Sequence, residues 1–153
     1  MTHAYYSTVL DHPVERVWAE IRDFGSYEWA GAGYAATLED GRPGDAVGCV
    51  RRIPVPDGPP MRQRLLAHSD LDRGYTYEVC EPSPLGVTDY RATLRLVPIT
   101  DGDRCLAEWS ATFECPPADR ADRVAQFRDR GFAVWLGSLR AALGAGEIMV
   151  DRT

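Results

Sequence analysis

Apolar and polar positions alternate along much of the chain. From 104 to 115 the apolar residues fall at odd positions, including Trp109 and Phe113, while Glu108 and most other even positions are polar. A period of two is typical of a β-strand with one face on a core and the other in water. Segment 87–98 repeats the pattern with Tyr90 on its apolar face. Both segments are therefore predicted to be strands with one buried face.

The remaining elements follow from the same patterns. Segments rich in Tyr, Thr and Val, bounded by turn signals, predict seven strands, at 4–10, 34–39, 47–55, 61–71, 75–81, 87–98 and 104–115. Helical spacing after Pro13 puts Val14, Val17, Trp18 and Ile21 on one face of a helix that ends near 23–25. Residues 26–33 are expected to form a second short helical turn or a loop. An apolar stripe over 118–143 predicts a final helix about 39 Å long.

This order of elements predicts an α+β fold. We expect a seven-stranded, curved antiparallel sheet wrapped around a long C-terminal helix, with two short helices after the first strand. The length fits one domain, predicted over 1–146 and followed by a C-terminal tail at 147–153.

Alternation also sorts the side chains of the other strands. Tyr75, Tyr77 and Val79 point inward, and in the strand before them Met61, Gln63, Leu65 and Ala67 do the same. Arg51 shares the face of Ile53, so it is expected inside, next to Gln63. His12 and His68 are expected at the surface or at element ends, and no Ser/His/Asp constellation is predicted.

Composition excludes several classes of function. All 17 basic residues are arginine, so the chain has no lysine for a Schiff base, for pyridoxal phosphate or for a phosphate-binding loop. A net charge of −6 argues against nucleic acid as a partner. The four cysteines are far apart and lack a C-x-x-C pair, which predicts reduced, mostly buried thiols and no metal site.

Location follows from the absence of certain patterns. No apolar run approaches the roughly 20 residues that cross a bilayer. The first residues also lack the basic and apolar regions of a secretion signal. We therefore expect a cytoplasmic protein without a membrane partner.

Five segments together point to a known family. They are Pro13-x-x-x-Val17-Trp18-x-x-Ile21-Arg22-Asp23-Phe24, and residues 47–53, 62–65, 89–94 and 108–113. With these segments in this order, the chain resembles the START-like, or SRPBCC, superfamily and its helix-grip fold. It is most similar to the group that includes polyketide cyclase/dehydrase-like bacterial proteins and plant abscisic acid receptors.

The resemblance implies a cavity between the sheet and the long helix that takes apolar or aromatic small molecules. It places residues 55–60, with Pro59, at the loop that closes over ligand in the receptors, and residues 83–86 at the neighbouring loop. The receptors' pocket lysine has no counterpart in residues 29–34. Abscisic acid binding is therefore not inherited, and Arg51 is the main candidate for a buried positive group.

Two functions remain open at this point. The first is a cofactor-independent cyclase or dehydratase acting on an aromatic or polyketide-like molecule. In it Arg51 polarises a carbonyl, and Tyr90 or Tyr77 donates the proton. The second is a non-catalytic carrier or sensor with the same cavity. The predicted substrate-binding residues are Gln63, Tyr75, Trp109, Phe113, Phe127, Gly131, Trp135 and Pro59.

Each of these assignments has an alternative. The aromatic residues could simply fill the core, and Arg51 could form a structural ion pair. The sequence does not decide between a monomer and a homodimer, and no cofactor is predicted.

Overall fold

The structure is a computed structural model that describes the backbone of residues 1–151 and the side chains of residues 1–145. In chain order the elements are β1 (Thr2–Leu10), α1 (Val14–Ile21), η1 (Glu28–Ala30), β2 (Thr37–Leu38), η2 (Glu39–Gly41), β3 (Val50–Val55), β4 (Gly58–Ser69), β5 (Gly74–Val79), β6 (Thr88–Ile99), β7 (Arg104–Glu114), η3 (Pro117–Asp119), α2 (Arg120–Ala125), η4 (Gln126–Phe132) and α3 (Ala133–Asp151). The predicted α+β class and strand sequence are confirmed.

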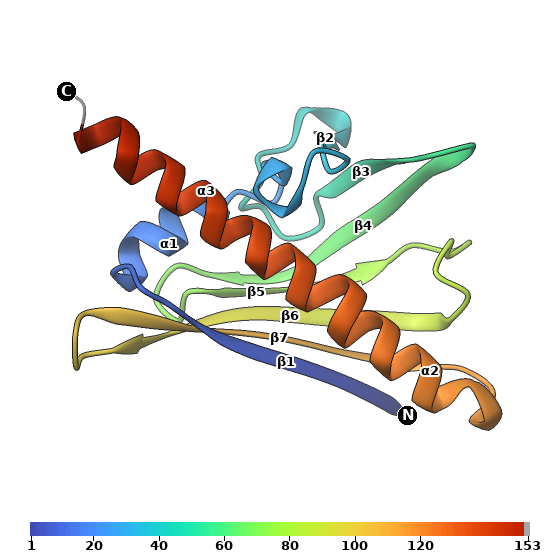
Figure 1. Cartoon of the computed structure of the whole chain (residues 1–153). Coiled ribbons are helices and arrows are strands. Elements are labelled where there is room, and N and C mark those ends of the chain that lie inside the picture. Colours follow the sequence, from blue (N-terminus) through green and yellow to red (C-terminus); the bar gives the residue numbers. More distant parts are fainter. Residues whose placement is uncertain (152–153) are drawn as a thin grey trace.

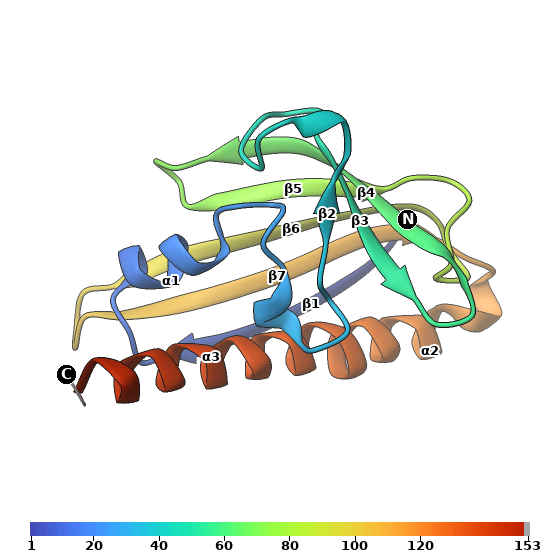
Figure 2. The ribbon, with the colours of Figure 1, turned by 90° about the horizontal axis from the view of Figure 1, so that it is seen from above.

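The strands form one antiparallel sheet in the order β1-β7-β6-β5-β4-β3-β2. The sheet curves around one side of the long C-terminal helix, which runs along its length (Figures 1 and 2). This is the helix-grip arrangement that the hydrophobic pattern and the resemblance predicted.

The predicted inner faces are confirmed on three strands. Trp109 and Phe113 of β7 and Tyr90 of β6 are buried, as are Tyr75 and Tyr77 of β5. Strand β7 pairs with β1 on one side and β6 on the other, so its buried side chains lie between two neighbouring strands. Burying them together with the apolar face of the helix provides the main driving force for folding.

A β-bulge makes part of the β4 prediction wrong. The register with β5 shifts between Leu65 and Ala67, which leaves Ala67 exposed. A single extra residue reverses the faces of every residue after it. His68, expected at the surface, is therefore half-buried, and its ring stacks on Tyr75 with an interplanar angle of 4°. His12 lies just before α1, as expected, but it is buried, at 7% exposure.

The C-terminal helix is continuous but not uniform. Its first turn is a 3₁₀ turn, and the segment Gln126–Phe132 between α2 and α3 is a π-helix. Pi segments inside α-helices are rare and often occur at functional sites. Here the segment turns Phe127 and Phe132 toward the sheet, and both are buried. The backbone remains helical to Asp151, through most of the predicted tail, and residues 152 and 153 lie outside the described part.

The β3–β4 connection is tighter than predicted. Val55 pairs directly with Gly58, so only Pro56 and Asp57 form the turn. Asp57 has a φ of 61°, which suits a turn with proline at its second position and a left-handed residue at its third. The expected loop over 55–60 is thus the end of a long hairpin.

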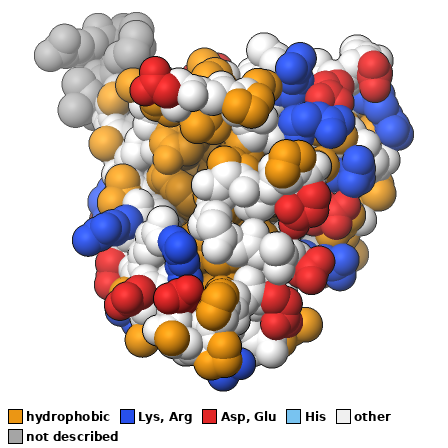
Figure 3. Space-filling view, turned by 90° about the vertical axis from the view of Figure 1, so that its right-hand side faces the viewer, with side chains coloured by type: hydrophobic (Ala, Val, Ile, Leu, Met, Phe, Trp, Pro, Cys, Tyr) orange, Lys and Arg blue, Asp and Glu red, His pale blue; other side chains and the backbone are white. Residues whose placement is uncertain are grey.

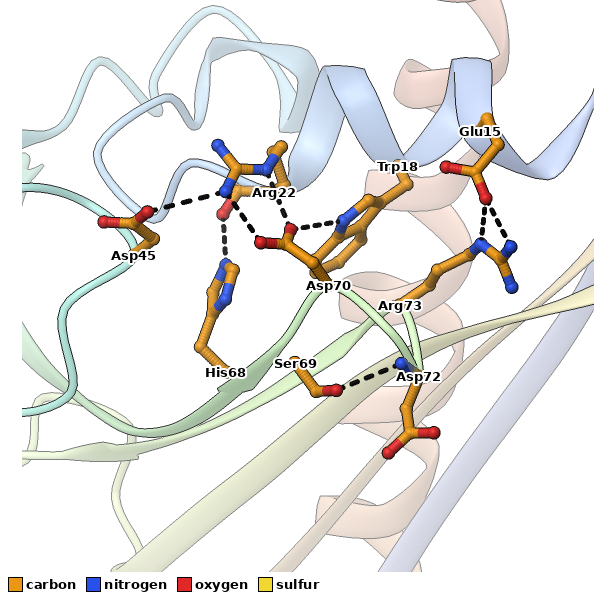
Figure 4. A network of polar contacts seen from close by, with 9 residues as sticks. All are labelled: Glu15, Trp18, Arg22, Asp45, His68, Ser69, Asp70, Asp72 and Arg73. Atoms are coloured by element: carbon orange, nitrogen blue, oxygen red, sulfur yellow. Dashed lines mark hydrogen bonds and ion pairs between the residues drawn. The ribbon is translucent and has the colours of Figure 1, made fainter.

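Polar contacts fix α1 over one end of the sheet (Figure 4). Asp70, just after β4, accepts hydrogen bonds from Trp18 Nε1 at 2.8 Å and Arg22 Nε at 3.0 Å. Arg73 forms an ion pair with Glu15. The Arg22 carbonyl oxygen lies 2.7 Å from His68 Nε2. Contacts from both ends of α1 therefore join it to the β4–β5 turn.

No helix in the described part of the chain is both long enough and apolar enough to pass through a bilayer.

Candidate functional site

Arg51 is the most unusual side chain in the core. It is completely buried on β3, directly opposite Gln63 of β4. Its Nε donates to Gln63 Oε1 at 2.7 Å, and its Nη1 donates to the Phe24 carbonyl oxygen at 3.3 Å. Its Nη2 has no hydrogen-bond partner. A buried group of this kind normally has every donor satisfied, so the free Nη2 needs an explanation.

Aromatic rings surround the guanidinium instead of acidic groups. Its central carbon lies 3.9 Å from the centre of the Phe24 ring, 3.8 Å from that of Tyr27 and 5.1 Å from that of Tyr77. Among the residues with described side chains, no carboxylate pairs with Arg51. The structural ion pair considered from the sequence is therefore absent there. Cation–π attraction offsets part of the cost of burying the charge.

The tyrosines near Arg51 keep their protons at neutral pH. Burial raises the pKa of Tyr77 above its ordinary value, and the Arg51 charge only partly opposes this. Burial also raises the pKa values of Tyr75 and Tyr90, and interaction with the Tyr77 hydroxyl adds to the rise at Tyr90. These hydroxyls can therefore donate hydrogen bonds, and they can donate a proton only to a more basic group such as a departing hydroxide; they do not act as bases.

Trp109 links the tyrosines to the helix. Its Nε1 donates to the Tyr77 hydroxyl at 3.2 Å, and its ring stacks on Phe132 with centroids 5.3 Å apart. Trp135 of α3 lies 5.0 Å from Trp109 and donates to the Tyr34 hydroxyl at 2.8 Å. Gly131 lies against the Trp135 ring, where a Cβ would come within 3.2 Å.

A second aromatic group lies beside the first. Phe127 of η4 is 4.9 Å from Phe113 and 5.1 Å from Tyr90, measured between ring centres. The Tyr90 hydroxyl interacts with that of Tyr77, so Tyr90 connects this group to the surroundings of Arg51.

Most of the predicted site residues therefore come together in the core. Pro59 does not. It is exposed near the tip of the β3–β4 hairpin, apart from the Arg51 surroundings. Its predicted place in a closing loop came from the resemblance, and the tight turn at Pro56 and Asp57 leaves Pro59 at the start of a strand.

Sequence reasoning missed the residues that complete the site. Phe24, Tyr27, Trp29 and Tyr34 lie in or beside a segment that was expected to be a short turn or loop, and all but Tyr34 are buried. The available signal was the density of aromatic residues between glycines in 24–34. Phe132 was missed because the predicted apolar stripe was drawn for a regular helix.

Five side chains of the site form a closed circuit of contacts, which we call the central ring. Arg51 contacts Tyr27, which meets Trp29 with ring centres 5.1 Å apart. Trp29 lies 5.8 Å from Trp109, which bonds to Tyr77, and Tyr77 returns to Arg51. The ring joins side chains from β3, β5 and β7 to the segment around η1.

Hollows are present away from the five residues of the central ring. A groove of about 650 Å³ lies across β4 to β7, and its lining includes Arg62, Arg64 and Arg91 together with the predicted site residues Tyr90 and Phe113. At the end of the molecule near the β3–β4 hairpin and α2, hydrophobic side chains show in a recess between charged ones (Figure 3). In the described part of the chain, no three His, Cys, Asp or Glu side chains gather as metal ligands.

Comparison with known proteins agrees with this architecture. Residues 1–144 match the family described as "Polyketide cyclase / dehydrase and lipid transport". The chain belongs to this family. The predicted membership in the polyketide cyclase/dehydrase-like group is thus confirmed. A search of curated proteins finds no match.

Solved structures of similar proteins extend over nearly the whole chain. A Thermobifida fusca protein is 27% identical with a TM-score of 0.83, and covers 95% of each chain. The protein XoxI of Bacillus cereus is 28% identical with a TM-score of 0.81, covering 96% of this chain and 99% of its own. Norcoclaurine synthase of Thalictrum flavum, a point mutant in complex with a transition state analogue, shares the fold. It is 15% identical with a TM-score of 0.73, covering 95% of each chain.

Proposed function

We propose that this member of the polyketide cyclase/dehydrase family binds an aromatic or polyketide-like molecule between the sheet and the long helix and promotes its cyclisation or dehydration. The observation that carries the proposal is the buried Arg51, whose Nη2 has no partner. A fixed positive donor of this kind stabilises negative charge that develops on a carbonyl oxygen.

The chemistry assigns a role to each neighbour of Arg51. Gln63 holds the guanidinium through Nε, which leaves Nη2 for the substrate oxygen. Tyr77 and Tyr90 remain protonated and can donate hydrogen bonds to the enolate or a proton to a departing hydroxyl group. The aromatic rings around them suit a planar hydrophobic substrate.

The substrate class follows from what the site lacks. Among the described side chains, no carboxylate or imidazole contacts Arg51, so no base lies directly beside the donor proposed to hold the carbonyl oxygen. Compounds with two carbonyl groups around one carbon enolise readily in water. A site that stabilises the enolate and supplies an acid is therefore sufficient for them.

The absence of a base beside Arg51 also favours a second candidate, a carrier or sensor that binds the molecule without changing it. A binding protein needs the donor and the aromatic walls, but it does not need a base. The two candidates are distinguished by turnover.

The test uses 3-[hydroxy(2-naphthyl)methyl]pentane-2,4-dione, which carries two carbonyl groups around one enolisable carbon and loses water to give a conjugated enone that absorbs at longer wavelength. We expect the chain to bind this ketone and to accelerate its dehydration over buffer. Arg51→Met should lower the rate by about 10²-fold or more. Arg91→Met, the same change at an exposed arginine of β6, should leave the rate unchanged.

The outcomes separate the candidates. Binding without acceleration would establish the carrier and overturn the catalytic proposal. Failure of the folded wild-type chain to bind the ketone at all would overturn both.

A further inference from the structure

Trp29 differs from the other three tryptophans of the chain in the hydrogen bonding of its indole N–H. The indole nitrogens of the other three each donate a hydrogen bond, Trp18 to Asp70, Trp109 to Tyr77 and Trp135 to Tyr34. Trp29 is 4% exposed, yet its Nε1 has no acceptor. Burying an N–H group without an acceptor costs about 1–3 kcal/mol, so such groups are rare in cores.

The backbone holds Trp29 firmly in this position. The indole belongs to the short turn η1, which packs against α3. Gly31 ends the turn with a φ of 146°, a conformation that favours glycine. Tyr27 meets the indole edge to face, and the ring centre of Trp109 lies 5.8 Å from that of Trp29. The backbone and the neighbouring rings thus fix the position of the unpaired indole N–H in the central ring.

Trp29 and Arg51 supply two unsatisfied donors to the same ring. Both contact Tyr27, the guanidinium carbon at 3.8 Å from its ring centre and the indole at 5.1 Å between centres. An indole N–H and a guanidinium can donate hydrogen bonds but cannot accept them. Whatever satisfies both groups must therefore present acceptors.

We propose that Trp29 is a specificity-determining residue that donates a hydrogen bond to a second oxygen of the bound molecule. This inference rests on the proposed function. The ligand presents one oxygen to Arg51 and another to Trp29, as a 1,3-dicarbonyl compound or its enolate does. A compound with one carbonyl leaves the Trp29 N–H buried and unpaired, which lowers its affinity.

The experiment compares two probes that differ by one carbonyl group, 1-(2-naphthyl)butane-1,3-dione and 1-(2-naphthyl)butan-1-one. Isothermal titration calorimetry gives the affinity of each. We expect the wild-type chain to bind the dione with about tenfold higher affinity than the monoketone. This is the typical effect of satisfying one buried hydrogen-bond donor. Trp29→Phe should abolish most of this preference by weakening dione binding, with little change for the monoketone.

Trp109→Phe is the matched control. It is the same substitution in the same ring, but its N–H already has a partner in Tyr77. We expect it to change the affinities for the two probes by the same factor and so to keep the preference. It should also lower the urea midpoint of unfolding more than Trp29→Phe does, because it removes a hydrogen bond that the free protein makes.

A second measurement removes the dependence on a folded Trp29→Phe variant. In the ¹⁵N-labelled wild-type chain, the indole N–H signal of Trp29 should shift downfield with the dione and much less with the monoketone. β-(3-Benzothienyl)alanine at position 29 keeps the two-ring shape without the N–H, and it should bind the dione no better than the monoketone.

Two results would overturn the inference. Equal loss of affinity for both probes in Trp29→Phe, with an unshifted indole signal, would make Trp29 a packing residue and leave the proposed function standing. Failure of both probes to bind the wild-type chain would overturn this inference and count against the proposed function as well.

Discussion

At the scale of single residues, the core carries a charge that it does not neutralise. Arg51 is completely buried, and its hydrogen-bond partners include two neutral groups, Gln63 and the Phe24 carbonyl. Burying a charge without a counterion is expensive, and removing one member of a buried hydrogen-bonded pair leaves the other unsatisfied. Arg51 and Gln63 should therefore behave as one unit in stability measurements.

A double-mutant cycle tests this coupling. Arg51→Met should destabilise the chain by about 1–3 kcal/mol, because Gln63 Oε1 loses its donor inside the core. Adding Gln63→Met should recover part of that loss, since both polar partners are then gone. Urea unfolding of the wild type, both single variants and the double variant gives the coupling energy. Additive effects, within error, would show that the two side chains do not act together.

At the scale of elements, ion pairs and hydrogen bonds join α1 to the β4–β5 turn. Hydrogen bonds from Arg22 and then Trp18 hold the pKa of Asp70 down at about 2. A carboxyl group whose pKa is lower in the folded state than in the unfolded state stabilises the folded state. This contribution is complete when the pH is above the pKa of the group in the unfolded state, near 4. The contribution is lost as the pH falls through the folded value near 2.

Asp70→Asn should therefore matter at neutral pH and not in acid. We expect the variant to unfold at lower urea concentration than the wild type at pH 7. The gap should narrow as the pH drops from about 4 to about 2, where Asp70 becomes protonated in the wild type too. Because Asp70 is exposed, the difference at pH 7 should be small and should shrink in high salt. A gap that stays constant over this pH range would contradict the assignment.

The strands and the C-terminal helix differ in how well their buried faces could be predicted from the sequence. The faces of β6 and β7 were predictable because uninterrupted alternation fixes them, and Trp109 and Phe113 are buried as expected. In β4 the register changes between Leu65 and Ala67, and no local pattern marks the bulge. His68 therefore faces the opposite way from its prediction. The π segment was missed as well, because Phe127 and Gly131 fit the stripe of a regular helix and only Phe132, five residues after Phe127, departs from it.

At the scale of the whole molecule, the core divides the four thiols into two pairs. Cys49 and Cys105 are buried, while Cys80 and Cys115 are half-buried. Burial raises the pKa of the Cys105 thiol to about 11 and also raises that of Cys49. A buried, protonated thiol is a poor nucleophile, because the thiolate is the reactive form.

Titration with 5,5′-dithiobis(2-nitrobenzoate) tests this division. At pH 8 we expect Cys80 and Cys115 of the native chain to react first, and Cys49 and Cys105 to react only at the rate of unfolding. All four should react at once in urea. Cys105→Ser should leave the fast phase unchanged, and Cys80→Ser should reduce it. Equal reactivity of all four thiols in the native chain would contradict the packing described.

The sequence by itself determined the fold class, the order of the strands along the chain and the burial of Arg51 beside Gln63. These follow from periodicity and alternation, which are local properties. Only the tertiary structure decided that no carboxylate pairs with Arg51 among the described side chains, and that Tyr27 and Trp29 complete the central ring. Those relations join residues distant in sequence, and a missing partner for a buried N–H can be recognised only when every neighbour is in place.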